Sequence, residues 1–165
     1  MKSSSTAVAL LKQHGLKKTP VRLIVLQLFT EHNFALSASD IEFLVRNQNN
    51  PQSPDRQSPL RVSPDRVSPD RVTIYRTLGT FEEKGIIHKA PDEGYGVKYA
   101  LCSEHCPDSA HEETHVHFVC HQCNHTYCLE DTHIPMVKLP GDYVVEGFSY
   151  TINGVCKTCK REAVN

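Results

Sequence analysis

Residues 72–89 read VTIYRTLGTFEEKGIIHK, and the fold prediction starts from this pattern. Its first part predicts a helix from Val72 to Lys84, which Ser68-Pro69 can cap and start. Gly85 is expected to end this helix, and the pattern changes to that of a strand from Ile86 to Lys89. A second strand, Val97 to Leu101, follows a turn rich in Gly, Asp and Pro, so a β-hairpin is expected after the helix.

Further helices are predicted upstream of this stretch. A short apolar segment from Thr6 to His14 comes first. Thr19-Pro20 then offers an N-cap followed by proline at the first helical position. Ser37 with Asp40 three residues later resembles a capping box that opens another helix. Helices followed by a hairpin are in the order of a winged helix-turn-helix.

A low-complexity repeat interrupts the chain between these helices and the stretch at 72–89. Residues 53–72 read SPDRQ, SPLRV, SPDRV and SPDRV. Proline at every fifth residue cannot continue a helix, so we expect a loop at about residues 51–68.

The remainder of the chain predicts strands. The segments at 115–120, 126–130 and 143–152 have strand character, with a short helix or turn near Thr132 to Leu139. We place a domain boundary near residues 89–92. The predicted fold class is therefore α+β, with a winged helix-turn-helix over residues 1–90 and a small α/β domain over residues 91–165.

The composition is that of an ordinary soluble protein. The chain has 165 residues and a mean hydropathy of −0.41, with no apolar run near the ~20 residues that span a membrane and no visible export signal. The expected location is the cytoplasm, without a membrane partner. Residues 1–90 hold 13 Lys and Arg against 8 Asp and Glu, whereas residues 91–165 hold 5 against 11. A basic amino-terminal half can meet phosphates.

Cysteine and histidine are concentrated in the second half. All seven cysteines lie between Cys102 and Cys159, and seven of the ten histidines lie between His105 and His133. An odd number of cysteines in a chain without an export signal argues against a disulfide framework. Metal binding is the better interpretation.

Two CxxC pairs carry the strongest chemical signal. They are Cys120 with Cys123 and Cys156 with Cys159. Two such pairs can complete a tetrahedral shell of four sulfurs around Zn²⁺, and a closed shell is structural rather than catalytic. The alternatives are a thioredoxin-like redox motif or unrelated buried thiols. The presence of two pairs favours structural zinc.

A second set of donors mixes imidazole with thiol. His115 and His117 share one face of a strand because side chains alternate. His88 and Cys102 lie on the predicted hairpin, and Cys128 lies on the strand after the first CxxC pair. Such a set suits Zn²⁺, whereas an oxygen-rich set would suit Fe²⁺ or Mn²⁺ better. The alternatives are a chance HxH on the surface and a cysteine that only packs. We expect His105, Cys106, His111, His121 and His125 to be solvated or at most to form a secondary site.

Several motifs together resemble the ferric uptake regulator (Fur) family, and its zinc-sensing (Zur-like) members most. They are KKTPVR at 17–22, the stretch at 72–89, HVHFVCHQC ending at Cys123, and the terminal CKTC. The resemblance covers about residues 5–160. It implies a dimeric repressor that binds operator DNA when a sensed metal fills a regulatory site, with residues 91–165 as the dimerisation domain.

The resemblance also implies roles for single residues. Structural zinc would be held by Cys120, Cys123, Cys156 and Cys159. The regulatory metal would be held by residues drawn from His88, Cys102, His115, His117 and Cys128. DNA contacts would come from Lys17, Lys18, Arg22, Thr73, Tyr75 and Arg76.

The chain departs from the family at several ligand positions. Ala35 stands where iron and peroxide sensors have a histidine. Thr114, Val116 and Phe148 stand where other members have further ligands, so we expect the extra metal site near the dimer interface to be absent.

These observations predict a metal-dependent, zinc-responsive repressor of metal homeostasis genes. Its partners would be double-stranded operator DNA and a second copy of the chain, with no small organic substrate and no enzymatic activity. The alternatives are an iron- or peroxide-responsive regulator of the same family, and a zinc-binding protein without DNA-binding activity. A zinc enzyme would need a general base beside an open coordination position, and no HExxH motif occurs.

Overall fold

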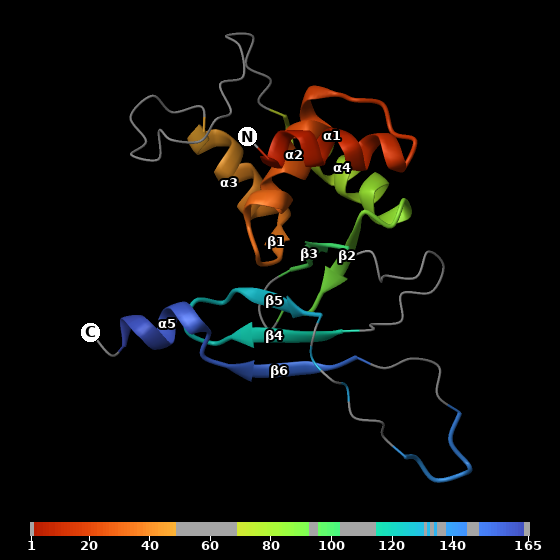
Figure 1. Ribbon diagram of the computed structural model, residues 1–165, viewed down its shortest axis with the longest axis vertical. Helices are drawn as coiled ribbons and strands as arrows, with labels where there is room; N and C mark the ends of the chain where they lie inside the picture. Colours follow the sequence, from red (N-terminus) through yellow and green to blue (C-terminus); the bar gives the residue numbers. More distant parts are fainter. Residues whose placement is uncertain are drawn as a thin grey trace.

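A computed structural model describes residues 2–48, 69–92, 96–102, 115–130, 132, 134, 138–144 and 149–163. The helices packed around the amino-terminal core are α1 (Lys2–Gln13), α2 (Pro20–Glu31), α3 (Ala38–Gln48) and α4 (Arg71–Glu83). The first sheet contains β1 (Leu36–Ser37), β2 (Ile87–Ala90) and β3 (Lys98–Leu101), and it lies below these helices (Figure 1). This order confirms the predicted helices and hairpin.

Two of the predicted helix starts are confirmed by their hydrogen bonds. The hydroxyl of Thr19 accepts from the Arg22 amide at 3.4 Å, and Pro20 is the first residue of α2. Before α3, the amide of Asp40 donates to Ser37 Oγ at 3.1 Å, while the Ser37 amide donates to Asp40 Oδ2 at 2.8 Å. This reciprocal pair is the capping box that the sequence predicted.

The start of α4 differs from the prediction. Its N-cap is Asp70, not Ser68-Pro69, and the helix begins at Arg71. The Asp70 carboxylate accepts from the Thr73 amide at 2.6 Å. A carboxylate suits this end because it satisfies a free amide and complements the positive end of the helix dipole. The first helix also differs, since α1 begins at Lys2 and not at Thr6.

The first sheet has the order β1-β3-β2. In the hairpin, His88 pairs with Ala100. The short strand β1 pairs with β3 through Leu36 and Tyr99, and this third strand was not predicted. A two-residue strand is too short to show an alternating pattern.

The second sheet has the order β5-β4-β6 and is followed by the helix α5 (Lys157–Glu162). The strands β4 (Val116–Cys120) and β5 (Thr126–Leu129) pair antiparallel, and β6 (Thr151–Gly154) runs parallel to β4.

The prediction of a strand at 143–152 was wrong in its position, since residues 143, 144, 149 and 150 lie outside any strand. The side chains of β6 are mostly exposed, so its sequence carries no buried alternation. The short helix α5 was not predicted at all. The described residues of the 132–139 segment are not helical, and the repeat at 51–68 lies outside the described residues.

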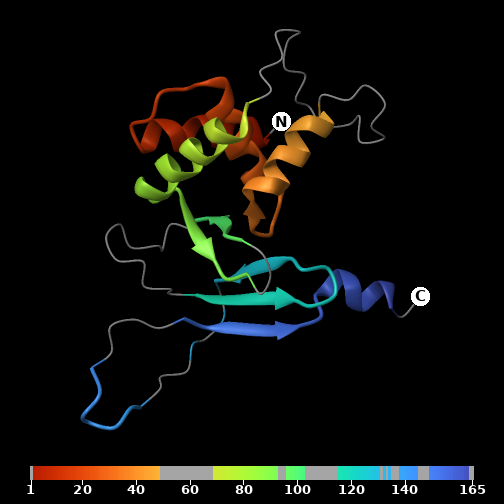
Figure 2. The same ribbon diagram turned by 180° about the vertical axis from the view of Figure 1, so that it is seen from behind.

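The hairpin brings the two sheets into contact (Figure 2). The amide of Ala35 donates to the carbonyl of Thr126 at 2.8 Å, and the Thr126 hydroxyl donates to the Pro91 carbonyl at 3.1 Å. The ring of Phe34 stacks on His125 with centroids 3.7 Å apart and planes 6° from parallel. The winged-helix region and the second sheet are therefore docked by specific contacts.

Within the described parts of the chain, the search for membrane-spanning helices finds none that combines the required length with the required apolar character.

Candidate metal centres and DNA-facing residues

Four thiols gather where the second sheet meets α5. The Sγ atoms of Cys120, Cys123, Cys156 and Cys159 all lie within 4.8 Å of one another. The sulfurs of Cys123 and Cys156 are 3.8 Å apart. Tetrahedral coordination at a Zn–S distance of ~2.3 Å places sulfurs ~3.8 Å apart. The four cysteines therefore fit a closed zinc shell.

The strand pairing explains why these distant cysteines meet. In the parallel pair β4–β6, Cys120 lies opposite Gly154, and this register brings Cys156 beside Cys120. The Cys156 amide donates to Cys120 Sγ at 3.3 Å. The turn after Cys120 closes through Asn124, whose amide donates to the Cys120 carbonyl at 2.8 Å. Asn124 has a φ of 57°, a left-handed conformation that asparagine tolerates better than most residues.

The thiols differ in how readily they ionise. The Cys159 amide and the Tyr127 hydroxyl donate to the Cys156 sulfur and lower the pKa of Cys156 to about 6. Burial, and then the neighbouring Cys156, raises the pKa of Cys159 to about 12. Four thiolates at this spacing repel one another, so a cation is required to hold all of them deprotonated.

A second group of donors combines three imidazoles with one thiol. Its members are His88, His115, His117 and Cys128, and their ligand atoms lie within 4.8 Å of one another. The Nε2 atom of His115 lies 3.2 Å from that of His117 and 3.2 Å from that of His88, and the third pair is 3.3 Å apart. The sulfur of Cys128 is 3.5 Å from His88 Nε2. Tetrahedral zinc with Zn–N of ~2.0 Å and Zn–S of ~2.3 Å gives N···N edges of ~3.3 Å and N···S edges of ~3.5 Å. This group also fits one ion.

The members of this mixed group come from both sheets. His88 lies on β2 of the hairpin, whereas His117 on β4 pairs directly with Cys128 on β5. The exposed fractions of the three histidines are only 8% for His88, 6% for His115 and 0% for His117. An ion held here would bind the winged-helix region to the second sheet.

Burial keeps the imidazoles of the second sheet neutral. Desolvation, followed by the neighbouring His115, lowers the pKa of His117 to about 4. Desolvation also lowers the pKa of His115, against an opposing effect of Glu130. A neutral imidazole has a free lone pair, which is the form that binds metal.

Cys102, the fifth of the predicted donors, lies beside the mixed group but outside it. Its sulfur lies 3.5 Å from Nδ1 of His88, the ring nitrogen that does not face the other donors. The amide of Cys102 donates to the Ile86 carbonyl at 2.9 Å, which holds it beyond the register pair of His88 and Ala100. This pairing places the sulfur on the outer side of the His88 ring.

The other predicted donors are elsewhere. His105, Cys106 and His111 lie outside the described residues, as do Thr114 and Phe148. His121 is exposed, and His125 stacks on Phe34. Ala35 and Val116 are buried and offer no ligand atom.

The residues expected at DNA lie mostly on the surface. Lys17 and Lys18 are exposed, and Arg22 donates to the Lys17 carbonyl at 3.2 Å. On α4, Thr73 is half-buried, whereas Tyr75 and Arg76 are exposed. Tyr75 is 47% exposed, so its side chain does not pack in the core.

Arg71 at the start of α4 lies beside Tyr75, and the sequence analysis did not single it out. Its guanidinium lies 5.7 Å from the centroid of the Tyr75 ring. Arg71 belongs to the last copy of the repeat, so the sequence pattern did not distinguish it from the arginines of the earlier copies, which were expected in a loop.

Comparison with known proteins agrees with this architecture. The sequence profile of the Ferric uptake regulator family matches residues 61–140. The ferric uptake regulation protein of Staphylococcus epidermidis is 28% identical over 163 residues, covering 98% of this chain and 99% of that protein. The chain is therefore similar to the ferric uptake regulator family. Proteins of this family are transcription regulators and not enzymes.

Solved structures of Fur-type regulators share the fold. A zinc uptake regulator complexed with zinc and DNA superposes with a TM-score of 0.57 at 19% identity, covering 100% of this chain and 99% of that one. The Vibrio cholerae ferric uptake regulator gives a TM-score of 0.54 at 20% identity, covering 90% of this chain and 98% of that one. At these identities the likeness confirms the α+β fold.

Proposed function

We propose that this protein is a zinc-responsive repressor that binds operator DNA when the mixed His and Cys group holds Zn²⁺. The observation that carries the proposal is the convergence of His88 from the hairpin with His115, His117 and Cys128 from the second sheet. Few arrangements other than a bound cation account for three Nε2 atoms within 3.3 Å of one another. Metal homeostasis genes are the expected targets.

The donor set favours zinc over iron or manganese. It consists of three imidazoles and a thiol, which suit Zn²⁺, and it contains no carboxylate. Ala35 at the histidine position of iron and peroxide sensors supports the same choice. Related structures include a regulator from Francisella tularensis described with iron and one from Pseudomonas aeruginosa described with manganese, so the metal has to be measured in this chain.

The ion would act by restricting the angle between two regions. The winged helix, residues 1–90, would carry α4 into the major groove, where Arg76 and Tyr75 would contact base edges or phosphates. Residues 91–165 would pair with a second copy, so that two α4 helices face a pseudo-palindromic operator. If the metal-bound arrangement is the one that fits the DNA, metal and DNA favour the same state.

The four-cysteine group would hold Zn²⁺ as a permanent staple of the second sheet. In this site the protein supplies four thiolates and leaves no position for a substrate. We expect the chain to work in the cytoplasm, where thiols stay reduced.

The test measures zinc content and DNA binding together. A duplex is selected from a random library with the zinc-loaded protein, and its affinity is followed by fluorescence anisotropy at buffered free Zn²⁺. We expect two zinc ions per chain and a loss of DNA affinity of at least tenfold when the ion of the mixed group is removed by mild chelation. His117→Ala and Cys128→Ser should each abolish this zinc dependence, while the exposed His121→Ala serves as the matched control.

Two outcomes would change the assignment. If His117→Ala binds DNA with unaltered zinc dependence, the mixed group is not the sensor. If the wild-type protein holds two zinc ions but selects no duplex, the protein is a zinc-binding protein without DNA-binding activity.

A further inference from the structure

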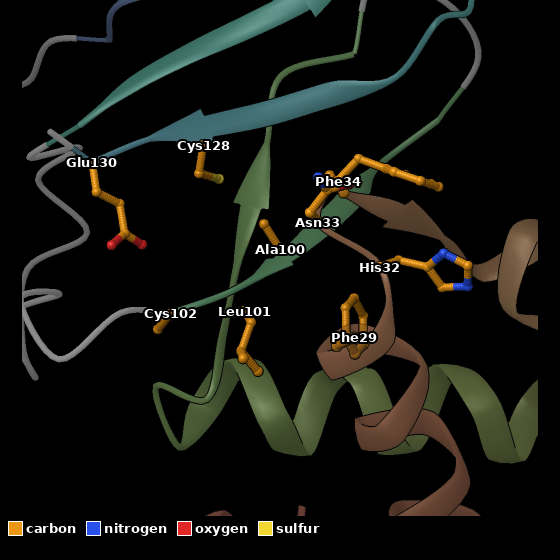
Figure 3. Close-up of a pocket in the computed structure, with 10 residues that line it drawn as sticks. Phe29, His32, Asn33, Phe34, Ala100, Leu101, Cys102, Cys128 and Glu130 are labelled. Carbon is orange, nitrogen blue, oxygen red and sulfur yellow. The ribbon is translucent and has the colours of Figure 1, made fainter. Parts of the chain in front are cut away.

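A pocket of about 610 Å³ lies between the start of α4, the start of α3 and the hairpin. Its lining includes Arg71 and Tyr75 on α4, Asp40 on α3 and Val97 beside β3. A different pocket, shown in Figure 3, is lined in part by Cys128 and so belongs to the metal site already described. The exposed ring of Tyr75 therefore borders an open space and not a packed core.

The ring of Tyr75 has a cation beside it. Arg71 lies one helical turn earlier on α4, and residues at this spacing share one face of a helix. The guanidinium carbon of Arg71 is 5.7 Å from the centroid of the Tyr75 ring, which is within the range of a cation–π contact. Tyr75 is also the main cause that raises the pKa of Arg71. Because the ring borders the open pocket, this contact limits the directions in which it can turn.

Arg71 is in turn held from α3. Its Nε lies 3.6 Å from Oε1 of Glu42, and the side chains are 65% and 18% exposed, respectively. This oxygen of Glu42 is buried and accepts no hydrogen bond from the residues that the structure describes, so Arg71 offsets a partly desolvated charge. The charge of Glu42 adds to the effect that raises the pKa of Arg71. A chain of contacts therefore runs from α3 through Arg71 to Tyr75.

We propose that Arg71 is a positioning residue for DNA recognition, with Glu42 holding its guanidinium so that it fixes the Tyr75 ring in the orientation that meets the operator. The inference rests on the proposed function, because it assigns Tyr75 a place at DNA. A ring that is ordered before binding loses less conformational entropy when the complex forms. Arg71 acts here through Tyr75 and needs no DNA contact of its own.

The first test follows the Tyr75 ring without DNA. Zinc-loaded protein is labelled with 3-fluorotyrosine, and the Tyr75 signal is assigned from its absence in Tyr75→Phe. Arg71→Leu should shift and sharpen this signal, because a ring freed from its neighbour moves faster. Leucine is about as good a helix former as arginine, so α4 is expected to remain intact. Lys84→Met is the matched control, because it removes a positive charge from the other end of α4 and should leave the signal unchanged.

The second test is a double-mutant cycle on the duplex selected from a random library. Arg71→Leu should weaken binding about two- to fivefold, the range of an exposed cation–π contact. In a Tyr75→Ala background the same change should have almost no further effect, since the residue through which Arg71 acts is gone. Arg71→Leu should also weaken the base preference at the position that Tyr75→Ala affects, whereas Arg71→Lys, which keeps a cation, should retain that preference.

Glu42→Gln separates positioning from net charge. Removing a carboxylate near DNA should by itself strengthen binding, most of all at low salt. Loss of the hold on Arg71 has the opposite sign and persists at high ionic strength, where we expect weaker binding than in the wild type. Glu83→Gln, at the other end of α4, is the control for charge alone. Binding by Glu42→Gln as tight as that of the wild type at high ionic strength would overturn the link to α3.

The outcomes distinguish this inference from the proposed function. An unchanged Tyr75 signal in Arg71→Leu would overturn the positioning role. An equal loss of affinity with and without Tyr75, together with a salt slope reduced by about one, would also overturn it, because a direct phosphate contact by Arg71 has this signature. If the wild-type protein selects no duplex, the proposed function fails, while the fluorine signal still decides whether Arg71 holds the Tyr75 ring.

Discussion

At the scale of single residues, the mixed group shows how burial prepares a site for a cation. His117 is fully buried, and its ring faces two other imidazoles at 3.2 Å and 3.3 Å. Protonating any one of them would place a positive charge in a poorly solvated space beside the other two rings. The pKa of His117 is therefore depressed to about 4, first by desolvation and then by His115. His117 therefore stays neutral at pH 7, and its lone pair stays free for a metal.

The depressed pKa of His117 predicts how stability depends on pH when the mixed group holds no metal. The folded value of about 4 lies below the ordinary value of 6.5, so the unfolded chain binds more protons between these limits. The stabilisation that neutral, buried His117 gives the folded protein is therefore present above pH 6.5 and is lost as pH falls toward 4. Between pH 7 and pH 5 the free energy of unfolding should drop by about 2 kcal/mol more in the wild type than in His117→Gln.

Urea unfolding of both proteins at the two pH values measures this difference. The four-cysteine group is the same in both proteins, so its response to acid cancels in the comparison. Parallel pH profiles would show that burial of His117 does not depress its pKa in the folded protein.

At the scale of elements, α4 has two separate roles on two faces. One face, with Ile74, Leu78 and Phe81, is fully buried in the amino-terminal core. The other face presents Tyr75 and Arg76 to solvent. The buried face anchors the helix, so the exposed face is held at a defined orientation, as the proposed DNA contacts require.

The cap of α4 is predicted to matter for both roles. Asp70 accepts from the Thr73 amide at 2.6 Å, and the hydrogen bonds from Thr73 lower the pKa of this carboxyl. Asp70→Ala should lower the melting temperature by about 2 to 5 °C and weaken operator binding through fraying of the first turn. Asp70→Asn is the control, since asparagine keeps the cap without the charge. Equal loss in both variants would mean that charge and not capping is responsible.

At the scale of the whole molecule, the two sheets are joined by contacts other than the proposed metal. Lys98 on β3 donates to the Asn124 carbonyl at 2.6 Å and lies 3.0 Å from the Asp92 carboxylate. Its side chain is only 12% exposed. This contact ties the hairpin to the turn that follows Cys123 of the four-cysteine group, and the amide of Ala35 adds a second link through the Thr126 carbonyl.

Lys98→Met should therefore loosen the docking of the two regions. The Asp92 carboxylate and the Asn124 carbonyl would lose a partner, at a cost of about 1 to 2 kcal/mol in the free energy of unfolding. The amide of Ala35 should exchange with deuterium faster, because its partner Thr126 belongs to the other sheet. Lys89→Met is the matched control: Lys89 pairs with Glu82 at 2.8 Å within the winged-helix region, so its loss should leave the Ala35 amide protected. The same exchange rate in both variants would contradict a docking role for Lys98.

Features that depend on nearby residues were the ones that sequence analysis predicted well. Each of these features involves residues no more than three apart: the Thr19-Pro20 start of α2, the capping box of Ser37 and Asp40, and each CxxC pair. The parallel pairing of β4 with β6 and the place of β6 were missed, because an exposed strand carries no buried pattern and a parallel partner can lie at any distance in the chain.

Spacing along the chain was thus enough to predict two kinds of metal donor, the thiols of the CxxC pairs and the imidazoles of the HxH. It was also enough to predict the motifs of a winged helix. Only the tertiary structure decided that Cys128 faces Nε2 of His88 while Cys102 faces Nδ1. The two sulfurs approach His88 from separate sheets, and the side each reaches depends on strand register and on how the sheets dock. Strand register and sheet docking depend on many long-range contacts, and no local pattern of residues encodes them.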